Sequence, residues 1–134
     1  MTALSQARPV VQIEGRQSNP PMKGATTIYQ GGLVVMDAGL AVPGRTATGL
    51  IAIGVAQQTV VNSGADGAKK VPTERGCFKF ANLGADAVTA ADIGKDCYIV
   101  DDQTVAKTSG TNTRSIAGKV IEVEADGVFV RVGN

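Results

Sequence analysis

The stretch VVMDAGLAV at residues 34–42 decides the fold, because its pattern returns 64 residues later as YIVDDQTVA at residues 98–106. Each stretch has an apolar run, a short polar turn and a second apolar run, and Asp37 holds the same place as Asp101. Two apolar runs that flank a turn-forming segment are typical of a β-hairpin. The sequence therefore predicts that one hairpin is used twice.

The similarity continues beyond both hairpins. Each is followed by a loop and then by an apolar segment that contains glycine, IAIGVA at residues 51–56 and SIAGKV at residues 115–120. Gly54 and Gly118 are again 64 residues apart. The chain is thus predicted to contain the same hairpin-plus-strand element twice.

Other stretches also have the pattern of strands. Residues 28–29 and 33–36 flank the turn-forming pair Gly31 and Gly32, and residues 50–61 form a long apolar run, interpreted as one largely buried strand. In residues 69–81, Phe78 and Phe80 share one face and Cys77, Lys79 and Ala81 share the other, while Pro72 indicates an edge or a bulge.

The C-terminal part has the clearest hairpin pattern. Apolar and polar residues alternate over 121–124, Asp126 and Gly127 form the turn, and Val128, Val130 and Val132 share one face. Residues 89–92 resemble a capping-box turn that Gly94 stops, and this is the only helix-like segment expected. The sequence therefore predicts an all-β fold, a small barrel or sandwich of short antiparallel strands with one short helical turn.

Composition agrees with a single small domain. The chain has 134 residues, 43% of them apolar, with 17 glycines and no tryptophan. Such a chain supports a modest core built from valine, isoleucine, alanine and leucine, with many turns and few helices.

Charge and hydropathy exclude several classes of partner. The net charge of +1 argues against nucleic-acid binding, which a basic excess normally accompanies. No apolar run has the length needed to span a bilayer, and the N-terminus lacks the apolar core of a secretory signal. Two cysteines are too few for a disulfide framework, so synthesis in a reducing cytoplasm is expected.

Residues 1–24 differ from the remainder, residues 25–134, which form the predicted β-domain. They contain three of the five prolines and have a charge of +2. We interpret them as an extended arm in which residues 10–13 (VVQI) could add a strand to a neighbouring sheet. A disordered tail is the alternative. The interaction residues expected in the arm are Arg8, Val10, Val11, Ile13, Arg16 and Lys23.

Side-chain chemistry gives no support for an enzyme. The chain has no histidine, which removes the commonest general base and a common metal ligand, and we expect no catalytic residues, cofactor or metal. Cys77 and Cys97 lack a partner to activate a thiolate; both are expected to be buried free thiols, with a bridge between them as the alternative. The pair Asp101 and Asp102 is interpreted as turn-forming, and residues 64–67 as a solvated loop.

The order of motifs from Gly32 to Val132 resembles the capsid decoration, or cement, proteins of tailed bacteriophages. The similarity is carried by GLVV (32–35) with GLAV (39–42), by IGVA (53–56) leading to RGCF (75–78), and by ADIGKDCYIVD (91–101) followed by IAGKV (116–120) and VFVRV (128–132). Each motif is a pattern of small and apolar residues, and their common order carries the resemblance. The arm lies outside it.

The resemblance implies a fold and a function together. It implies a β-tulip-like domain that is not an enzyme and that binds major capsid protein on the outside of the virion. It also implies a homotrimer at threefold positions, made in the host cytoplasm, with no small-molecule substrate, nucleic acid or membrane as partner.

Three other kinds of function are alternatives to capsid decoration. A carbohydrate-binding or adhesin-like module would normally expose flat aromatic rings, and only 4% of this chain is aromatic. A redox enzyme would depend on Cys77 and Cys97. A head-fibre or tail protein would differ from a decoration protein in its number of copies per particle.

Overall fold

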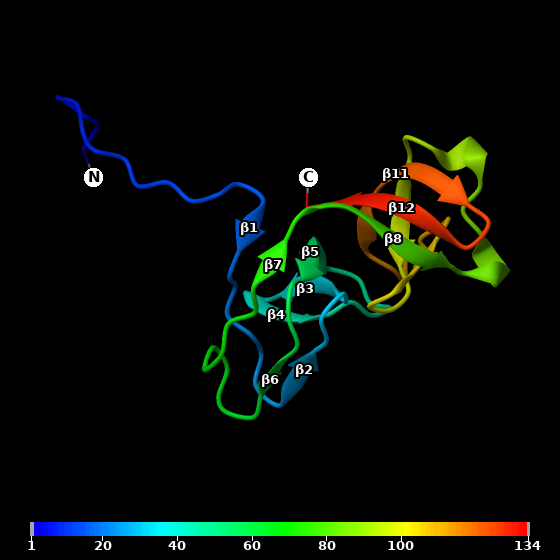
Figure 1. Ribbon diagram of the computed structural model, residues 1–134, viewed down its shortest axis with the longest axis horizontal. Coiled ribbons are helices and arrows are strands. Elements are labelled where there is room, and N and C mark those ends of the chain that lie inside the picture. The colour runs from blue at the N-terminus through cyan, green and yellow to red at the C-terminus, as the bar shows by residue number, and fades with distance from the viewer. Residues whose placement is uncertain (1, 134) are drawn as a thin grey trace.

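The computed structural model describes residues 2–133, which form an all-β body with an N-terminal arm standing away from it (Figure 1). Within these residues there are twelve strands and two short 3-10 helices. The elements are β1 (Gln17–Ser18), β2 (Thr26–Ile28), β3 (Leu33–Asp37), β4 (Leu40–Pro43), β5 (Ile51–Ala56), β6 (Val60–Asn62), β7 (Thr73–Glu74), β8 (Gly76–Asn82), η1 (Gly84–Asp86), η2 (Ala90–Asp92), β9 (Asp96–Ile99), β10 (Thr104–Ala106), β11 (Ile116–Glu124) and β12 (Gly127–Val132). The predicted all-β class is confirmed.

The strands form two larger units and a small ribbon. The first unit is a five-stranded curled sheet in the order β1-β7-β5-β3-β4, and the second is a closed barrel in the order β10-β8-β12-β11-β9. Strands β2 and β6 pair as a separate ribbon below the first unit in Figure 1. Strands β7 and β8 are separated only by Arg75, so this segment passes directly from one unit into the other.

The repeat predicted from the sequence is visible in the pairing. Hairpin β3-β4 with β5 in the first unit corresponds to β9-β10-β11 in the second, and each pair has a register shift beside the glycine. A Cβ at Gly54 would lie 2.7 Å from the carbonyl carbon of Glu74, and a Cβ at Gly118 would lie 2.9 Å from that of Arg131. Both glycines are therefore required by close approach of a neighbouring backbone.

The two units are closed differently. In the barrel, β8 and β10 pair in parallel, which corrects the expectation of antiparallel strands throughout. In the first unit, the segment 17–23 takes the corresponding place. Its β1 pairs with β7, and Met22 forms a parallel bridge with Ala41 of β4. Residues 17–23 therefore belong to the body, and the exposed arm is shorter than residues 1–24.

Two apolar clusters fill the interior. The larger one lies inside the barrel and extends to Leu33, Val35 and Leu50 of the first half of the chain. The smaller one is formed by Met22, Ile28, Val34, Ala41, Ala56 and Val71. Val128, Val130 and Val132 are fully buried, as the alternation in the C-terminal hairpin predicted.

Local features were predicted with mixed success. The capping box at Thr89 and Asp92 is present around η2, whereas η1 is a second helical turn that the sequence argument missed. The apolar run 50–61 is not one strand, because exposed Gln57, Gln58 and Thr59 separate β5 from β6.

Candidate functional site: an exposed arm and an apolar groove

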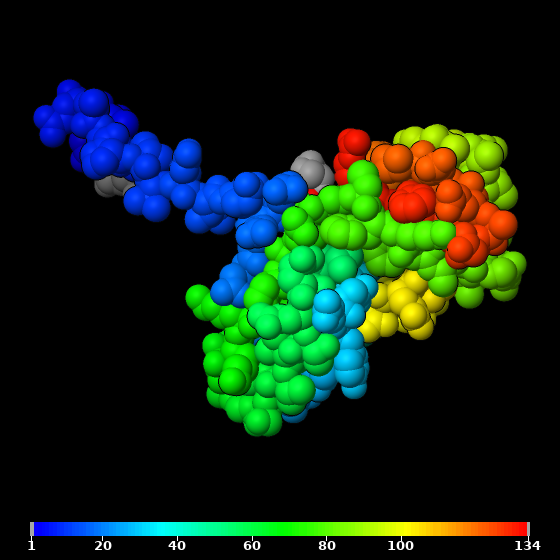
Figure 2. All heavy atoms as spheres, in the orientation of Figure 1, coloured from blue at the N-terminus to red at the C-terminus, as the bar shows by residue number. Residues whose placement is uncertain are grey.

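The arm is the most exposed apolar segment of the described chain. Leu4, Val10, Val11 and Ile13 all present most of their side chains to solvent, and Val11 is 95% exposed. Figure 2 shows these first residues as a narrow projection from the compact body. Apolar side chains held out in this way have no role in the core, so they are candidates for binding another surface.

A short turn fixes the direction in which the arm leaves the body. The backbone N–H of Gln17 donates to the carbonyl of Glu14 at 3.1 Å, and the backbone N–H of Arg16 donates to Glu14 Oε1 at 3.1 Å. That backbone hydrogen bond, with the Arg16 guanidinium 3.5 Å away, lowers the pKa of Glu14. The Arg75 backbone N–H donates to the carbonyl of Arg16 at 2.8 Å, which anchors the turn to the body.

The six predicted arm residues are not gathered at one place. Arg8, Val10, Val11 and Ile13 lie on the exposed arm, and Arg16 lies in the anchoring turn. Lys23 lies on the body, where its backbone N–H donates to the carbonyl of Ala41 at 3.1 Å.

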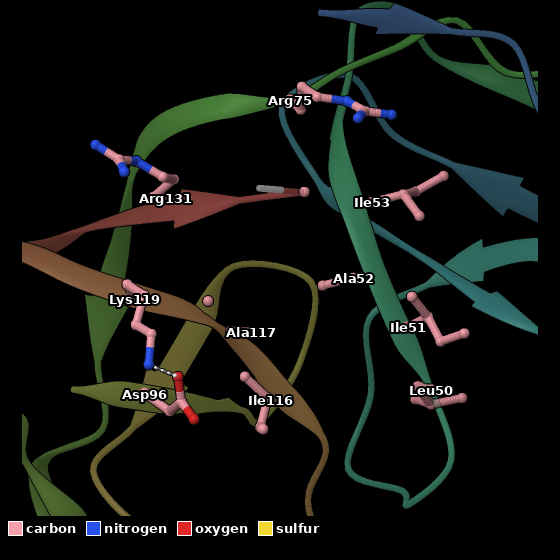
Figure 3. Close-up of a pocket in the computed structure, with 12 residues that line it drawn as sticks. Leu50, Ile51, Ala52, Ile53, Arg75, Asp96, Ile116, Ala117, Lys119 and Arg131 are labelled. Atoms are coloured by element: carbon pink, nitrogen blue, oxygen red, sulfur yellow. Dashed lines mark ion pairs between the residues drawn. The ribbon is translucent and has the colours of Figure 1, made fainter. Parts of the chain in front are cut away.

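A groove of about 510 Å³ lies between the two units and is here called the β5–β11 groove. One side is formed by Leu50 to Ile53 of the β5 segment and the other by Ile116 to Lys119 of β11 (Figure 3). Ile51 is 65% exposed and Ile116 is 48% exposed. A hydrogen bond from the Leu50 N–H to the Ser115 hydroxyl, 3.0 Å long, joins the two sides at one end.

Each side of the groove is a strand segment that pairs with another strand on its far side, β5 with β3 and β11 with β9. On the groove side of β5, strand β7 pairs only with Val55 and Ala56. On the corresponding side of β11, the ladder with β12 begins at Lys119. Within residues 2–133, residues 51–52 and 116–117 have no ladder partner toward the groove, whereas the backbone of Gly133 lies against Ile53 and that of Arg131 lies against Gly118.

Charged groups lie at the rim of the groove. Arg75 and Arg131 stand at one end in Figure 3, and Lys119 pairs with Asp96 at 2.8 Å on the β11 side. The buried Nε of Arg75 has no hydrogen-bond partner among residues 2–133. The groove thus combines an apolar floor with basic side chains at its rim.

Only one of the two cysteines is buried, whereas burial was expected for both. Cys97 is buried, as predicted, and burial raises the pKa of its thiol to about 12. Cys77 is exposed on the outward face of β8, which is not the position expected for it. Both thiols are free, and they lie on strands that are not neighbours.

The side chains of Asp101 and Asp86 stabilise loops through hydrogen bonds. Asp101 Oδ1 accepts from the Gln103 backbone N–H at 2.9 Å, as the turn interpretation predicted. Asp86 accepts from the Thr108 hydroxyl at 2.6 Å and from the Arg114 guanidinium at 3.0 Å, and these contacts lower its pKa. Within residues 2–133, no three side chains of the metal-binding types gather into a cation site. No helix of that part of the chain is long and apolar enough to cross a membrane.

The groove was not found by sequence reasoning. Ile51 and Ile116 were assigned to predicted strands, but nothing local indicated that their edges would face each other. The only available signal was their place at the start of the two repeated glycine-containing segments.

Comparison with known protein families, with characterised proteins and with solved structures found no match to this chain.

Proposed function

We propose that this chain is a structural protein of a tailed-phage virion that decorates the outside of the capsid and stabilises it at capsomer junctions. The observation that carries the proposal is the combination of a closely packed β body with a protruding apolar arm. Neither part requires a cofactor, a substrate or a catalytic group to act. A small rigid body with one binding extension suits a protein that acts by attachment.

Attachment to an assembled shell gives stability by mass action. A protein that binds capsomers only where they meet lowers the free energy of the assembled state relative to that of separated capsomers. Many identical copies repeat this contribution around the lattice, and a trimer at a threefold position adds the advantage of several linked contacts. The partners in this proposal are the major capsid protein and further copies of the same chain.

The arm is the proposed attachment element. Val10, Val11 and Ile13 would supply apolar contacts and backbone pairing, and Arg8 would meet acidic groups on the capsid. Arg16 and Lys23 have a different role in this scheme, because the first orients the arm at its base and the second lies on the body.

Removing residues 2–13 tests this function, because the deletion leaves the anchoring turn and Met22 in place. The shortened protein should retain the far-ultraviolet circular dichroism and melting temperature of the full chain but fail to bind purified undecorated capsids in co-sedimentation. Full occupancy on capsids without the arm would overturn the proposal.

The number of copies in purified particles separates decoration from the other virion roles. Quantitative mass spectrometry should find the protein at hundreds of copies for a lattice-wide role. A few copies per particle would instead indicate a head-fibre or tail protein, and complete absence from virions would reject a structural role.

A further inference from the structure

Three exposed lysines lie together where the segment that closes the first unit meets the loop before β7. The backbone N–H of Met22 donates to the carbonyl of Lys69 at 2.9 Å, and Pro21 forms an antiparallel bridge with Lys70. Lys23 follows Met22 directly, so it continues the same short ladder. Lys23, Lys69 and Lys70 are here called the lysine patch.

The alternation of side chains turns the lysine patch toward solvent. Met22 and Val71 are fully buried. Adjacent residues of an extended segment point to opposite faces, so Lys23 and Lys70, which adjoin these two buried residues, point outward. Lys69 lies at the end of the ladder and is exposed as well. The three ammonium groups are therefore available to another molecule.

The patch carries positive charge that its surroundings do not balance. None of the three lysines forms an ion pair within residues 2–133. The acidic side chain of the adjoining loop is Asp66, whose Oδ1 accepts from the Gly24 backbone N–H at 2.9 Å. With that aspartate counted, residues 20–24 and 64–71 have a formal charge of +2.

The backbone that carries the patch is fixed by hydrogen bonds. Asn62 Nδ2 donates to the carbonyls of Met22 and Lys23 at 3.0 and 3.2 Å. The backbone N–H of Gly67 donates to the carbonyl of Met22 at 2.8 Å. Binding through the patch would therefore order the lysine side chains without having to order a loop, which lowers the entropic cost of binding.

We propose that the lysine patch binds an acidic surface of the major capsid protein, as a second contact beside the arm. This inference rests on the proposed function and adds a part of the body to the attachment surface. The arm and Lys23 belong to one continuous segment, and in Figure 1 the base of the arm and the loop between β6 and β7 lie on the side away from the barrel. A molecule attached through its arm thus has the patch near the same shell, where complementary charge fixes its orientation.

The charges of the chain favour the capsid protein over other partners. The whole chain has a net charge of only +1, which does not suit a nucleic acid. A second copy offers little free negative charge on its barrel side, because four acidic side chains there already form ion pairs within their own molecule. They are Asp86, Asp96, Glu124 and Asp126.

Removing the charge of the patch tests its contribution to capsid binding. The variant Lys23→Gln with Lys69→Gln and Lys70→Gln should bind purified undecorated capsids about tenfold more weakly than the full chain in co-sedimentation, because three exposed ion pairs are lost. Added salt should weaken binding of the full chain more than binding of this variant, since salt screens exposed charges. Equal affinity of the variant and the full chain would overturn the inference.

A second triple variant is the matched control for net charge. Lys95→Gln with Lys107→Gln and Arg131→Gln removes the same charge from exposed positions on the barrel. Lys95 and Lys107 line a depression together with Asp92 and Asp96, which balance them locally. The control should bind capsids like the full chain, and circular dichroism checks that both variants are folded. Equal weakening by the two variants would show an effect of net charge alone and would reject the patch as a contact.

Carbodiimide cross-linking identifies what the patch touches, because this reagent joins a lysine amine to a carboxylate only where the two groups are in contact. Mass spectrometry of treated decorated particles should find Lys23, Lys69 or Lys70 joined to aspartate or glutamate residues of the major capsid protein. Cross-links from these lysines to second copies of the chain alone would reject the capsid protein as the partner.

The same measurements separate this inference from the proposed function. Capsid binding that is strong for the full chain and equally strong for the patch variant would keep the function and reject the inference. A full chain that does not bind capsids at all would reject both.

Discussion

The two halves of this molecule have the same strand arrangement but are closed by different kinds of segment. In the second half, β8 and β10 form a regular parallel ladder that completes the barrel. In the first half, the proline-containing segment 17–23 reaches across to β4, and Met22 is its only bridge there within residues 2–133. A repeated hairpin-plus-strand element therefore does not determine how its sheet is closed.

The different closure also explains how the arm is held. The segment that closes the first half continues directly from the arm, so the exposed residues are joined to the core through Met22 and β1. The barrel has no comparable extension within residues 2–133. The first half therefore carries both the closing segment and the exposed arm, whereas the second half is more regular.

Truncation of the N-terminal segment should have the largest effect on the stability of the first half. Removing residues 2–13 should leave stability unchanged, but removing residues 2–23 should unfold the first half, because loss of the buried Met22 side chain alone is expected to cost about 2–5 kcal/mol. Chemical denaturation and hydrogen exchange would measure the difference. Equal stability of the two truncated proteins would show that the segment 17–23 does not close the first half.

Gly54 and Gly118 lie at equivalent places in the two halves, so the same substitution can be compared at both. Gly54→Ala and Gly118→Ala should each lower the free energy of unfolding by about 3 kcal/mol, since the new methyl group would meet a neighbouring carbonyl. Gly84→Ala is the control, because its Cβ would meet no heavy atom within 4 Å. Urea denaturation gives the three values, and a Gly84→Ala effect as large as the others would contradict the argument.

Replacement of one asparagine in each half should lower the free energy of unfolding by a smaller amount. Asn62 is buried, and its Nδ2 donates to the carbonyls of Met22, Lys23 and Ala65 at 3.0–3.2 Å. Asn82 makes two hydrogen bonds with Val88, both 2.8 Å long. We expect Asn62→Ala to cost about 2–3 kcal/mol and Asn82→Ala about 1–2 kcal/mol. The opposite order in urea denaturation would show that the first-half closure depends little on Asn62.

Acid should affect the second half more than the first. The pKa of Asp86 is lowered by hydrogen bonds from Thr108 and by Arg114, and that of Asp92 is lowered by the backbone N–H of Thr89. A carboxylate with a depressed pKa stabilises the fold above its unfolded pKa of about 4, and this contribution is lost as pH falls through the folded pKa. Melting temperature measured from pH 7 to pH 2 should fall less steeply for the variant Asp86→Asn with Asp92→Asn. An unchanged slope would show that Asp86 and Asp92 do not contribute to the loss of stability in acid.

Local patterns in the sequence predicted most of the fold. The two hairpins, the alternation of Val128, Val130 and Val132, and the capping box at Thr89 are all set by residues near one another in the chain. The break between β5 and β6 was missed because Gln57 and Gln58 interrupt an otherwise apolar run without a glycine or proline to mark the turn.

Long-range pairing limited the prediction of the closure and of the candidate site. Prolines in the segment 17–23 indicated an arm, and only the position of Ala41 in the folded sheet shows why Met22 is buried. The groove likewise depends on two strands more than 60 residues apart whose edges meet only after folding. Val10, Val11 and Ile13 could be placed on an arm from the sequence because residues 1–24 contain three of the five prolines and few signals of regular structure.

The anchoring of the arm has a mechanical consequence. A pulling force applied to residues 10–13 enters the body along β1, whose antiparallel ladder with β7 is followed in the chain by the buried Met22. The β7 segment continues through Arg75 into β8 of the barrel, so tension is passed from the first half to the second rather than concentrated at the chain end. Stretching single molecules by the arm should therefore give one unfolding event for the whole body.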